Sequence, residues 1–344
     1  MEIKGILIST LAPMNDHIAN AGDKILKNAS SIKQRPDGRV YISGQKQRHA
    51  LFSAIERLND SEKARLKQDN NQYHETYVSN GDGVTIQIEN DLRADLGGFL
   101  QTKKGTYSGR RTAPVTATPA VAKEPSEIGR DLLIRLTQNP KVISEEDYDE
   151  LEESEKAKYS KKPQAIVHRE YSQSDLMLMN FFIDVSAVSI RKRHQYTNGM
   201  HVKTEYFKHV TEAERKRRIH LTIEATASLT DYANQARNAT SGEPQQVLIV
   251  FDTKLSRKAC RYFNALENER RNILRELQSR NAVYFFGDDV NGGQLDKDGN
   301  PLEPYSVVDA YTKAIAFLND KTNQLFNLTG KDEPITTQQF EEMQ

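Results

Sequence analysis

The residues with the most evident chemistry are four neighbouring hydrogen-bond donors that follow a serine and a glycine: Gln45, Lys46, Arg48 and His49. Guanidinium, ammonium and imidazolium groups bind phosphate oxygens through charge-assisted hydrogen bonds. A helix that starts here would add the unpaired N–H groups of its first turn and the positive end of its dipole. The pattern therefore predicts an anion site, and the alternative is an ordinary basic, solvated helix start.

The neighbouring sequence supplies the elements that would position these donors. Residues 40–42 are β-branched or aromatic and predict a strand, and Ser43 can cap a helix that begins near Gly44. The apolar residues of that helix recur at helical spacing, at Leu51, Ala54, Ile55 and Leu58. A strand, a short hinge and a basic helix start thus follow one another directly.

The charges of the chain are balanced overall but unevenly distributed. There are 48 basic and 48 acidic residues, which argues against a simple nucleic-acid-coating protein. Between Arg191 and His220, however, nine Lys/Arg stand against three Glu, and four of the eight histidines lie in the same stretch. Residues 145–158 carry eight carboxylates in fourteen positions, for which a solvated face is the favoured interpretation. This polarity suits a subunit that presents a basic face to RNA.

The composition is that of a protein with a core and many polar insertions. The 344 residues are 37% apolar, and the single cysteine, Cys260, excludes an internal disulfide framework. No stretch has the ~18 consecutive apolar residues of a membrane span, and the first residues lack the pattern of a signal peptide. We therefore expect a cytoplasmic protein with no membrane partner.

The hydrophobic pattern predicts a mixed order of strands and helices. Strands are expected at 3–11, 83–89, 132–136, 165–171, 177–190, 246–252 and 283–286, and helices at 219–236, 256–280 and 306–318. The strand at 177–190 is long and apolar, so we expect it in the centre of the main sheet. Residues 91–125 are rich in Gly, Thr, Pro and basic residues and are predicted as a loop that orders on binding.

One segment carries a strong hairpin signal. Asn198 and Gly199 stand between two alternating segments, 190–196 and 201–207. Asn-Gly is favoured in two-residue hairpin turns because both central residues take positive φ. We therefore predict a β-hairpin with Tyr196 and Met200 near its tip.

Several segments, taken in order, resemble a known family. They are the first strand (3–11), the polar loop with Asn15, Asp16, His17, Asn20 and Gly22, the helix start Ser43-Gly-Gln-Lys-Gln-Arg48, and the blocks Gly97–Leu100, Arg110–Val115 and Ile219–Leu229. This succession resembles the backbone subunit of Cascade, the CRISPR RNA-guided surveillance complex, in its DevR or autoregulator-type branch. None of these blocks is a catalytic signature, and the match is specific as an ordered set.

The resemblance implies an α+β fold, with a modified RNA-recognition-motif (ferredoxin-like) palm, a mostly helical finger insertion and a β-hairpin thumb. On this sequence the palm would comprise residues 1–58, 131–188 and 219–344, the fingers 59–130 and the thumb 189–218. In this family the thumb of one subunit folds over the guide toward its neighbour. The basic stretch that begins at Arg191 would then belong to the thumb.

The resemblance also implies a function, that of a subunit which polymerises along CRISPR guide RNA and helps it pair with target DNA, in antiviral defence or guide-directed transposition. Its partners would be guide RNA, target DNA, copies of itself and other Cascade subunits. Because the guide sequence varies and its bases must pair, such a subunit grips phosphates and sugars. The residues expected to contact RNA are Gln45, Lys46, Arg48, His49, Lys103, Lys104, Tyr107, Arg110, Arg111, Arg191 and Arg193, with Tyr196 or Met200 as a wedge between nucleotides.

The sequence shows none of the catalytic motifs that would point to an enzyme. It has no phosphate-binding loop of the Gly-x-x-x-x-Gly-Lys-Ser/Thr type, no His-Glu-x-x-His and no Gly-x-Ser-x-Gly. We therefore expect no cofactor, no metal and no enzymatic activity. Two alternatives stay open: a type III-like subunit that cleaves target RNA with Asp16 or Asp23, and a nucleic-acid-binding autoregulator.

Overall fold

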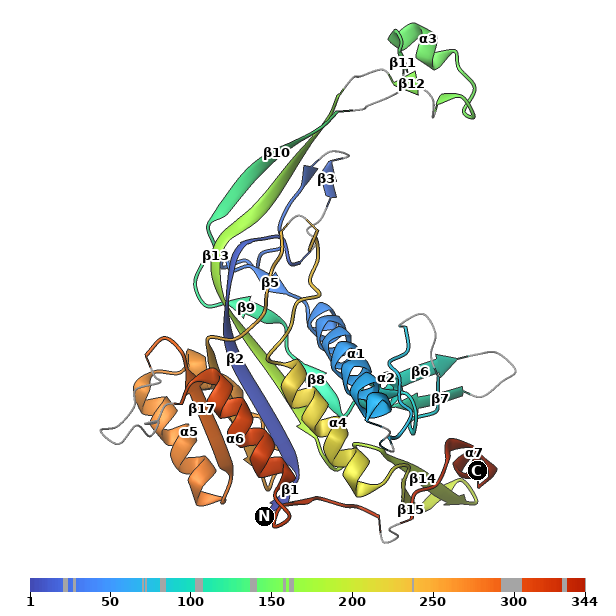
Figure 1. Ribbon diagram of the computed structural model, residues 1–344, viewed down its shortest axis with the longest axis vertical. Coiled ribbons are helices and arrows are strands. Elements are labelled where there is room, and N and C mark those ends of the chain that lie inside the picture. The colour runs from blue at the N-terminus through green and yellow to red at the C-terminus, as the bar shows by residue number, and fades with distance from the viewer. Residues whose placement is uncertain are drawn as a thin grey trace.

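The computed structural model describes residues 1–20, 24–26, 29–69, 71, 73–80, 85–102, 108–136, 141–156, 159–160, 164–236, 238–291, 305–329 and 333–343. Over these residues we find no helix that combines the length and the apolar character needed to cross a membrane. A large antiparallel sheet forms the centre of the molecule, and a long two-stranded arm extends from it (Figure 1).

The sheet has the strand order β17-β16-β2-β13, and β8 and β9 pair with the far side of β13. The bounds are β2 Gly5–His17, β8 Val115–Ala117, β9 Ala120–Ala122, β13 Gln164–Asp184, β16 Gln246–Asp252 and β17 Val283–Asp288. The central position of β13 is confirmed. It is one continuous strand, however, where two were predicted, and it ends at Asp184 rather than at residue 190.

Alternate residues of the strands contribute to two cores on opposite faces of the sheet. Ile6 and Ile8 pack with the helices α1 (Gly44–Gln68), α4 (Glu212–Ala225) and α6 (Val307–Asn319). Leu7 and Leu11 pack with the 3-10 helix η2 (Lys258–Asn264) and with α5 (Glu267–Ser279). The period of two in a strand sends neighbouring side chains to opposite faces, so a strand that is apolar throughout must be covered on both.

The interpretation of residues 91–125 as a loop is wrong. This segment contains α2 (Leu92–Gly97), β6 (Phe99–Thr102), β7 (Ser108–Arg111), β8 and β9, and Leu92, Leu96 and Val115 are fully or almost fully buried. The strands are three or four residues long and are separated by Gly and Pro, so no window is long enough to show a hydrophobic period. Within the range 59–130, which was assigned to the finger insertion, β8 and β9 are part of the main sheet.

Three other boundaries differ from the prediction. Where a strand was expected, residues 85–87 have no regular structure and residues 88–89 form a turn, and residues 256–280 divide into η2 and α5. Helix α4 begins at Glu212, seven residues before the predicted start, because the Thr211 side chain accepts a hydrogen bond from the Glu214 N–H and caps the helix. Residues 212–218, which were assigned to the thumb, are therefore part of helix α4.

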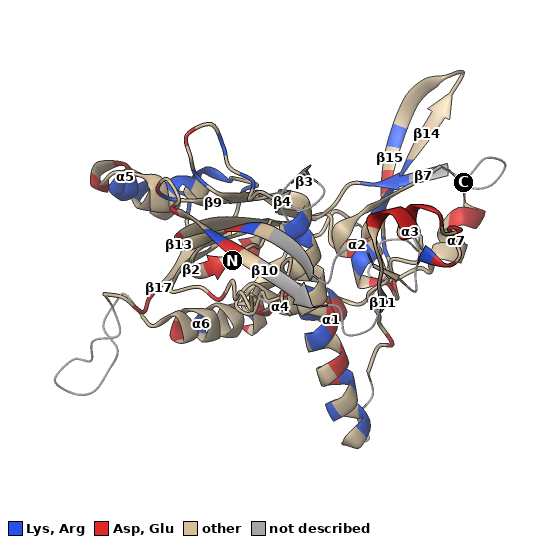
Figure 2. Ribbon diagram, turned by 90° about the horizontal axis from the view of Figure 1, so that it is seen from above, with Lys and Arg blue, Asp and Glu red and all other residues tan. Residues whose placement is uncertain are grey.

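The predicted hairpin is confirmed. Strands β14 (Ile190–Thr197) and β15 (Met200–Lys208) pair with each other and form a sheet of their own. Asn198 and Gly199 take φ of 53° and 76°, as a two-residue turn of this type requires. The hairpin projects from the body, and the C-terminus lies beside its base (Figure 2).

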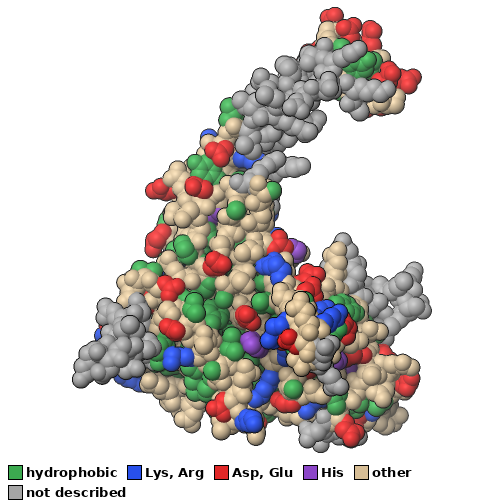
Figure 3. All heavy atoms as spheres, viewed as in Figure 1, with side chains coloured by type: hydrophobic (Ala, Val, Ile, Leu, Met, Phe, Trp, Pro, Cys, Tyr) green, Lys and Arg blue, Asp and Glu red, His purple; other side chains and the backbone are tan. Residues whose placement is uncertain are grey.

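The long arm is made of β10 (Ile128–Leu136) and the first half of β13, which pair in antiparallel register. At its far end lies the short helix α3 (Glu145–Asp149), none of whose residues is buried. The carboxylates of this region form the end of the arm (Figure 3), in agreement with the interpretation of residues 145–158 as a solvated face. The other short elements are β1 (Glu2–Ile3), β3 (Lys24–Leu26), β4 (Ala29–Ser30), β5 (Tyr41–Ile42), β11 (Lys141–Val142), β12 (Tyr159–Ser160), β18 (Gln324–Leu325) and α7 (Thr337–Glu342).

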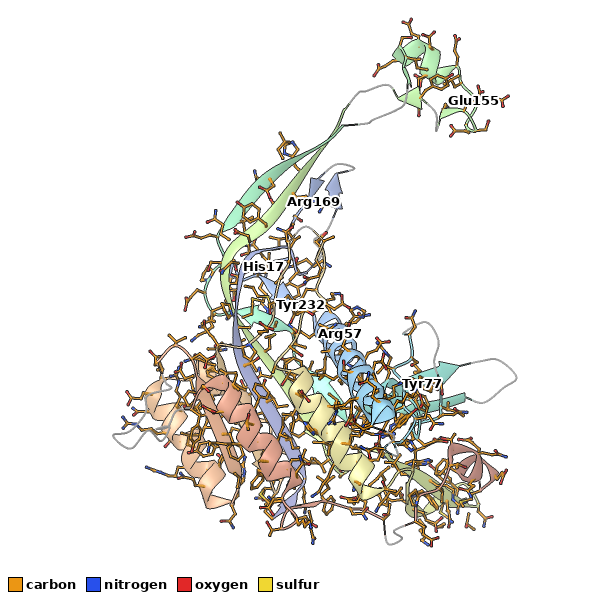
Figure 4. All side chains as sticks on the ribbon, in the orientation of Figure 1. His17, Arg57, Tyr77, Glu155, Arg169 and Tyr232 are labelled. Carbon is orange, nitrogen blue, oxygen red and sulfur yellow. The ribbon has the colours of Figure 1, made fainter. Side chains whose placement is uncertain are left out.

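A buried polar cluster joins the arm to the body at the end of β2 (Figure 4). His17 Nε2 lies 2.7 Å from Asp175 Oδ2, and the Ser126 hydroxyl donates to Asp175 Oδ1 at 2.5 Å. Burial raises the pKa of the Asp175 carboxyl, but the hydrogen bonds with His17 and Ser126 help to outweigh this effect, and the pKa lies below its ordinary value. The charged form of Asp175 therefore stabilises the fold.

Candidate nucleic-acid interface

The start of α1 has the geometry that its sequence predicts. The Ser43 hydroxyl accepts a hydrogen bond from the Lys46 N–H at 3.2 Å and caps the helix. Gln47 points inward and accepts a hydrogen bond from the hydroxyl of Tyr232, which lies beside the helix (Figure 4). Gln45 and His49 are at the surface. The burial of Gln47 fixes the rotation of the helix and turns its neighbours toward the surface.

A pocket of about 500 Å³ lies beside this helix start. It brings together Gln45, Arg48 and His49, three of the four residues predicted there, with residues from two other segments. The other lining residues are Phe52, which is also on α1, and Ser79, Asn80, Thr85, Arg93, Ala94, Gly98 and Phe99. The pocket is therefore formed by α1, by the chain before α2, and by α2 and the start of β6.

Two arginines face this pocket without carboxylate partners. Arg48 donates a hydrogen bond to the Gly97 carbonyl oxygen, and the Arg93 guanidinium lies 5.1 Å from the centre of the Phe52 ring. The Nε atoms of Arg48 and Arg93 are both buried and have no hydrogen-bond partner, and neither arginine forms an ion pair with any described residue. Two cations that line one pocket without an ion-pair partner among the described residues make the site suited to an anion.

Electrostatics agree with this assignment. Burial lowers the pKa of Arg48, and the positive charge of Arg93 lowers it further. Burial also lowers the pKa of Arg93, although Asp91 and Glu56 partly offset the effect. Two cations at one pocket attract a negative ligand.

Arg93 is a pocket residue that the sequence patterns did not single out, although a signal for it exists. Asp91 caps α2 by accepting a hydrogen bond from the Arg93 N–H at 2.9 Å, and Leu92 and Leu96 point into the core. An Asp followed by apolar residues four positions apart is a helix start, and it places Arg93 on the surface side of that helix. This signal was overlooked because residues 91–125 were interpreted as a loop.

Lys46 and His49 lie near the pocket, but an acidic residue is close to both. His49 Nε2 is 2.9 Å from Asp231 Oδ2, and this pair is exposed. Burial lowers the pKa of Lys46, and Asp231 partly restores it. Lys46 does not line the pocket. These two residues are therefore weaker candidates for phosphate contact than Arg48.

Arg111, which was predicted to contact RNA, is engaged within the protein. The side chain is almost fully buried, donates to the carbonyl oxygens of Ala187 and Ile190 at 2.6 Å each, and pairs with Asp95 at 2.5 Å. Arg110, its neighbour on β7, points the other way and is exposed, as a candidate for RNA contact should be. The predictions for Lys103, Lys104 and Tyr107 lie outside the described residues.

Asp95 is the centre of a buried network of hydrogen bonds and ion pairs. Several of the basic residues counted in the sequence belong to this network. It accepts hydrogen bonds from Arg111, from Arg218 Nη1 at 2.6 Å and from the Ser189 hydroxyl at 2.6 Å. Burial raises the pKa of the Asp95 carboxyl, but Arg111 and Arg218 outweigh it and hold the pKa below its ordinary value. Arg215 is also fully buried, and it donates to the carbonyl oxygens of Val185 and Val188. These arginines hold the fold together.

Arg191 and Arg193, also predicted to contact RNA, are likewise engaged within the protein. Arg191 is 8% exposed and pairs with Glu341 at 2.9 Å. Arg193 pairs with Glu205 at 2.6 Å and donates to the carbonyl oxygen of Met343. His209, another residue of the basic stretch, is buried, and burial together with the charges of Arg191 and Arg111 lowers its pKa from 6.5 to about 3.

The face of the hairpin opposite Arg191 and Arg193 is exposed to solvent at its tip. Tyr196 and Met200, the two predicted wedge residues, are 63% and 68% exposed at its tip. On the same face as Tyr196 lie His194 and His201, whose ring centres are 5.5 Å apart, and both rings contact the Thr204 hydroxyl. These histidines were not predicted as site residues, although residues 194 and 196 share a face by the strand period of two.

Of the two aspartates of the cleavage alternative, the structure describes Asp16. Asp16 is exposed, has φ of 45°, and uses its carbonyl oxygen as acceptor for the Asn238 side chain. Asp23 lies outside the described residues. Within the part of the chain that the structure describes, no three His, Cys, Asp or Glu side chains are grouped so that they could hold a metal ion.

Comparisons with known proteins agree with the resemblance seen in the sequence. A family model described as CRISPR-associated negative auto-regulator DevR/Csa2 matches residues 26–254. The fold is similar to a chain of a structure titled CRISPR RNA-guided surveillance complex (TM-score 0.51, 14% identity, 91% of this chain and 99% of that one). It is also similar to a chain of one titled CRISPR RNA-guided surveillance complex, pre-nicking (TM-score 0.55, 13% identity, the same coverage). No curated protein matches the sequence. The chain belongs to the DevR/Csa2 family of CRISPR-associated proteins.

Proposed function

We propose that this protein is a backbone subunit of a Cascade-type complex that binds CRISPR guide RNA through its phosphates. The observation that carries the proposal is the pair Arg48 and Arg93, two half-buried cations with unpartnered Nε atoms at one pocket. A phosphate at this position would supply acceptors to both guanidinium groups. Contacts of this kind do not depend on base identity, as binding of variable guides requires.

An RNA-recognition-motif-like palm is supported by the order of the elements along the chain. The sequence β2, α1, β8/β9, β13, α4, β16 has the strand–helix–strand–strand–helix–strand pattern of ferredoxin-like folds. In space β2 and β13 are the inner strands, and α1 and α4 pack on the same face. Under this proposal the β14–β15 hairpin is the thumb, now limited to residues 190–208.

The thumb would contact nucleotides through its tip. Tyr196 and Met200 are exposed and apolar or amphipathic, so they are suited to stack on or wedge between bases. Repetition of this contact by copies of the subunit along one guide would leave the bases between thumbs free to pair with target DNA. The assembly would include other Cascade subunits, and the two surveillance-complex titles among the similar structures support such a setting.

We further propose that the subunit acts without cleaving RNA or DNA, since its candidate interface consists of cations and aromatic rings. The test is to express the chain with a CRISPR array transcript and to purify the product. We expect a large assembly that contains protected RNA of uniform length, and added complementary RNA should stay intact. A bare monomer without RNA would refute the binding proposal, and regularly spaced cuts that disappear in Asp16→Ala would show that the subunit cleaves.

A further inference from the structure

The C-terminal segment, residues 335–343 with helix α7, covers one face of the β14–β15 hairpin at its base. Strand alternation places Arg191, Arg193, Glu205 and Phe207 on this face, while Tyr196 lies on the other. The covered face is the one whose arginines were predicted to contact RNA. We call the residues 335–343 the C-terminal clamp.

The clamp contacts the hairpin through one aromatic anchor and several polar groups. The Phe340 ring is 1% exposed, lies 5.5 Å from the Phe207 ring in an edge-to-face arrangement, and has the Arg191 guanidinium 4.1 Å above its centre. Glu341 Oε1 pairs with Arg191 at 2.9 Å, and the Ile335 N–H donates to the Lys208 carbonyl oxygen at 2.8 Å. The hairpin base is therefore held by apolar, ionic and backbone contacts at once.

The C-terminal clamp also contacts the segment that leads to the pocket lined by Arg48 and Arg93. The Thr337 N–H and hydroxyl donate to the Glu89 carboxylate at 2.9 and 2.5 Å, and the hydroxyl also contacts the Ile86 carbonyl oxygen at 3.2 Å. Residues 86–89 follow Thr85 and precede Arg93, both of which line the pocket. The clamp thus joins the hairpin to the segment that positions Arg93.

Neither a two-stranded hairpin nor a single short helix is expected to be stable alone. A two-stranded hairpin outside a larger sheet is marginal in water, and a helix of six residues is far below the length at which isolated helices form. In α7 only Thr337 and Phe340 are buried. The orientation of the hairpin therefore depends on the clamp, and the clamp in turn is ordered by the hairpin.

We propose that the C-terminal clamp is a positioning element, in which Phe340 and Glu341 hold the hairpin at a fixed direction relative to the Arg48–Arg93 pocket. The consequence for RNA binding rests on the proposed function. A hairpin held at a fixed angle can contact the same RNA strand as the pocket. The geometric part of the proposal, that the direction of the hairpin depends on Phe340, does not depend on the proposed function.

The geometric part is tested by the distance between two spin labels. Labels at Thr197→Cys on the hairpin and Ser61→Cys on α1, in a Cys260→Ala background, should give one narrow distance distribution by pulsed electron resonance. Phe340→Ala should broaden this distribution, Glu341→Gln should broaden it less, and the neighbouring exposed change Glu342→Gln should leave it unchanged. A distribution equally narrow in Phe340→Ala and in the parent would overturn the proposal.

The functional part is tested by RNA affinity in the same variants. If the binding-competent direction is reduced to about one tenth of the population, the affinity for guide-length RNA should fall about tenfold. Binding of a trinucleotide that reaches only the pocket should be unchanged. Tighter binding by Phe340→Ala would show instead that the clamp blocks Arg191 and Arg193. If the parent itself binds no RNA, the proposed function fails, while the spin-label result still decides the positioning role.

Phe340→Ala is checked for folding by hydrogen exchange. Amides of β2, β13 and β16 should stay as protected as in the parent, and faster exchange should be confined to β14–β15. Should Phe340→Ala unfold the chain, Phe340→Leu, which keeps most of the apolar volume, takes its place together with Glu341→Gln. Unchanged label distances in both of these variants would equally refute the proposal.

Discussion

Arg218 and Asp95 form a fully buried ion pair that joins α4 to α2: Arg218 Nη1 lies 2.6 Å from Asp95 Oδ2, and neither side chain is exposed. Arg218 also donates to Glu214 Oε1 at 2.9 Å and to the carbonyl oxygens of Ile88 and Glu89. A cation that stands in a basic stretch of the sequence is thus fully enclosed in the protein. It fixes α2, and α2 carries Arg93 of the pocket.

Removal of either partner of this pair should strongly destabilise the protein. Arg218→Ala leaves the Asp95 carboxylate with one arginine fewer in a buried site, and we expect a decrease of about 3–5 kcal/mol in the free energy of unfolding. Urea denaturation followed by circular dichroism measures it. The control is Arg275→Ala on the exposed side of α5, which should change stability by less than about 0.5 kcal/mol. Equal stabilities for the two variants would contradict the role of Arg218.

Acid should destabilise the protein through Asp95 and Asp175. Both carboxyls have a folded-state pKa below the ordinary value of 3.8. A depressed folded pKa contributes stability that is fully present above the unfolded pKa and is lost as the pH falls through the folded pKa. The contribution of these two carboxyls should therefore fall steeply below about pH 4, and the depressed pKa of His209 should add a gradual loss of stability that begins below about pH 6.5.

The variant Asp175→Asn separates this effect from general acid denaturation. It removes one of the titrating groups, so it should be less stable than the parent at neutral pH and show a shallower fall between about pH 4 and pH 2.5. Urea midpoints at several pH values measure both quantities. An acid slope identical to that of the parent would mean that Asp175 carries no pH-dependent stability.

RNA affinity should depend on the pocket arginines in a manner independent of sequence. The double variant Arg48→Ala/Arg93→Ala should weaken binding about equally for unrelated RNA sequences, because phosphate contacts carry no base information. The slope of log affinity against log salt should become shallower by about 0.7 for each phosphate that the variant no longer neutralises. Fluorescence anisotropy at four salt concentrations measures both, and Arg275→Ala is the control that removes a cation far from the pocket. An unchanged salt slope in the double variant would show that this pocket does not bind RNA phosphates.

The hairpin tip should affect binding but not folding. Tyr196 and Met200 are largely exposed, so replacing both by Ala should change the unfolding free energy by less than about 0.5 kcal/mol. If Tyr196 stacks on a base, its removal should cost about 1–3 kcal/mol of binding free energy. Val308→Ala, an exposed apolar change on α6, should alter neither quantity. If the variant with both Tyr196 and Met200 replaced by Ala bound RNA as tightly as the parent, these residues could not act as a wedge between nucleotides.

Local patterns were sufficient for the features that short stretches of chain determine. The Ser43 cap, the strand 246–252 and the Asn198-Gly199 turn depend on neighbouring residues, and each was predicted within a residue or two. Such signals act over one helical turn or one strand pair. They also placed three residues of the candidate pocket correctly on one helix.

The errors concern partners that are distant in the sequence. Arg111, Arg191 and Arg218 were counted as surface cations because their carboxylates, Asp95 and Glu341, lie 16 to 150 residues away. Counting charges in a stretch also ignores the strand period, which sends alternate side chains to opposite faces. The fold decides which cations are paired in the core and which remain for a ligand.

The most direct measurement of the RNA-binding interface is mass-spectrometric mapping of ultraviolet crosslinks between the purified subunit and its bound guide RNA. We predict crosslinked peptides from two regions: residues 45–52 together with 93–99 at the pocket, and residues 194–201 at the hairpin tip. These crosslinks should fade as salt is raised. Crosslinks confined to α5 or to the arm, with none at the pocket, would contradict the assignment of Arg48 and Arg93 to the guide RNA.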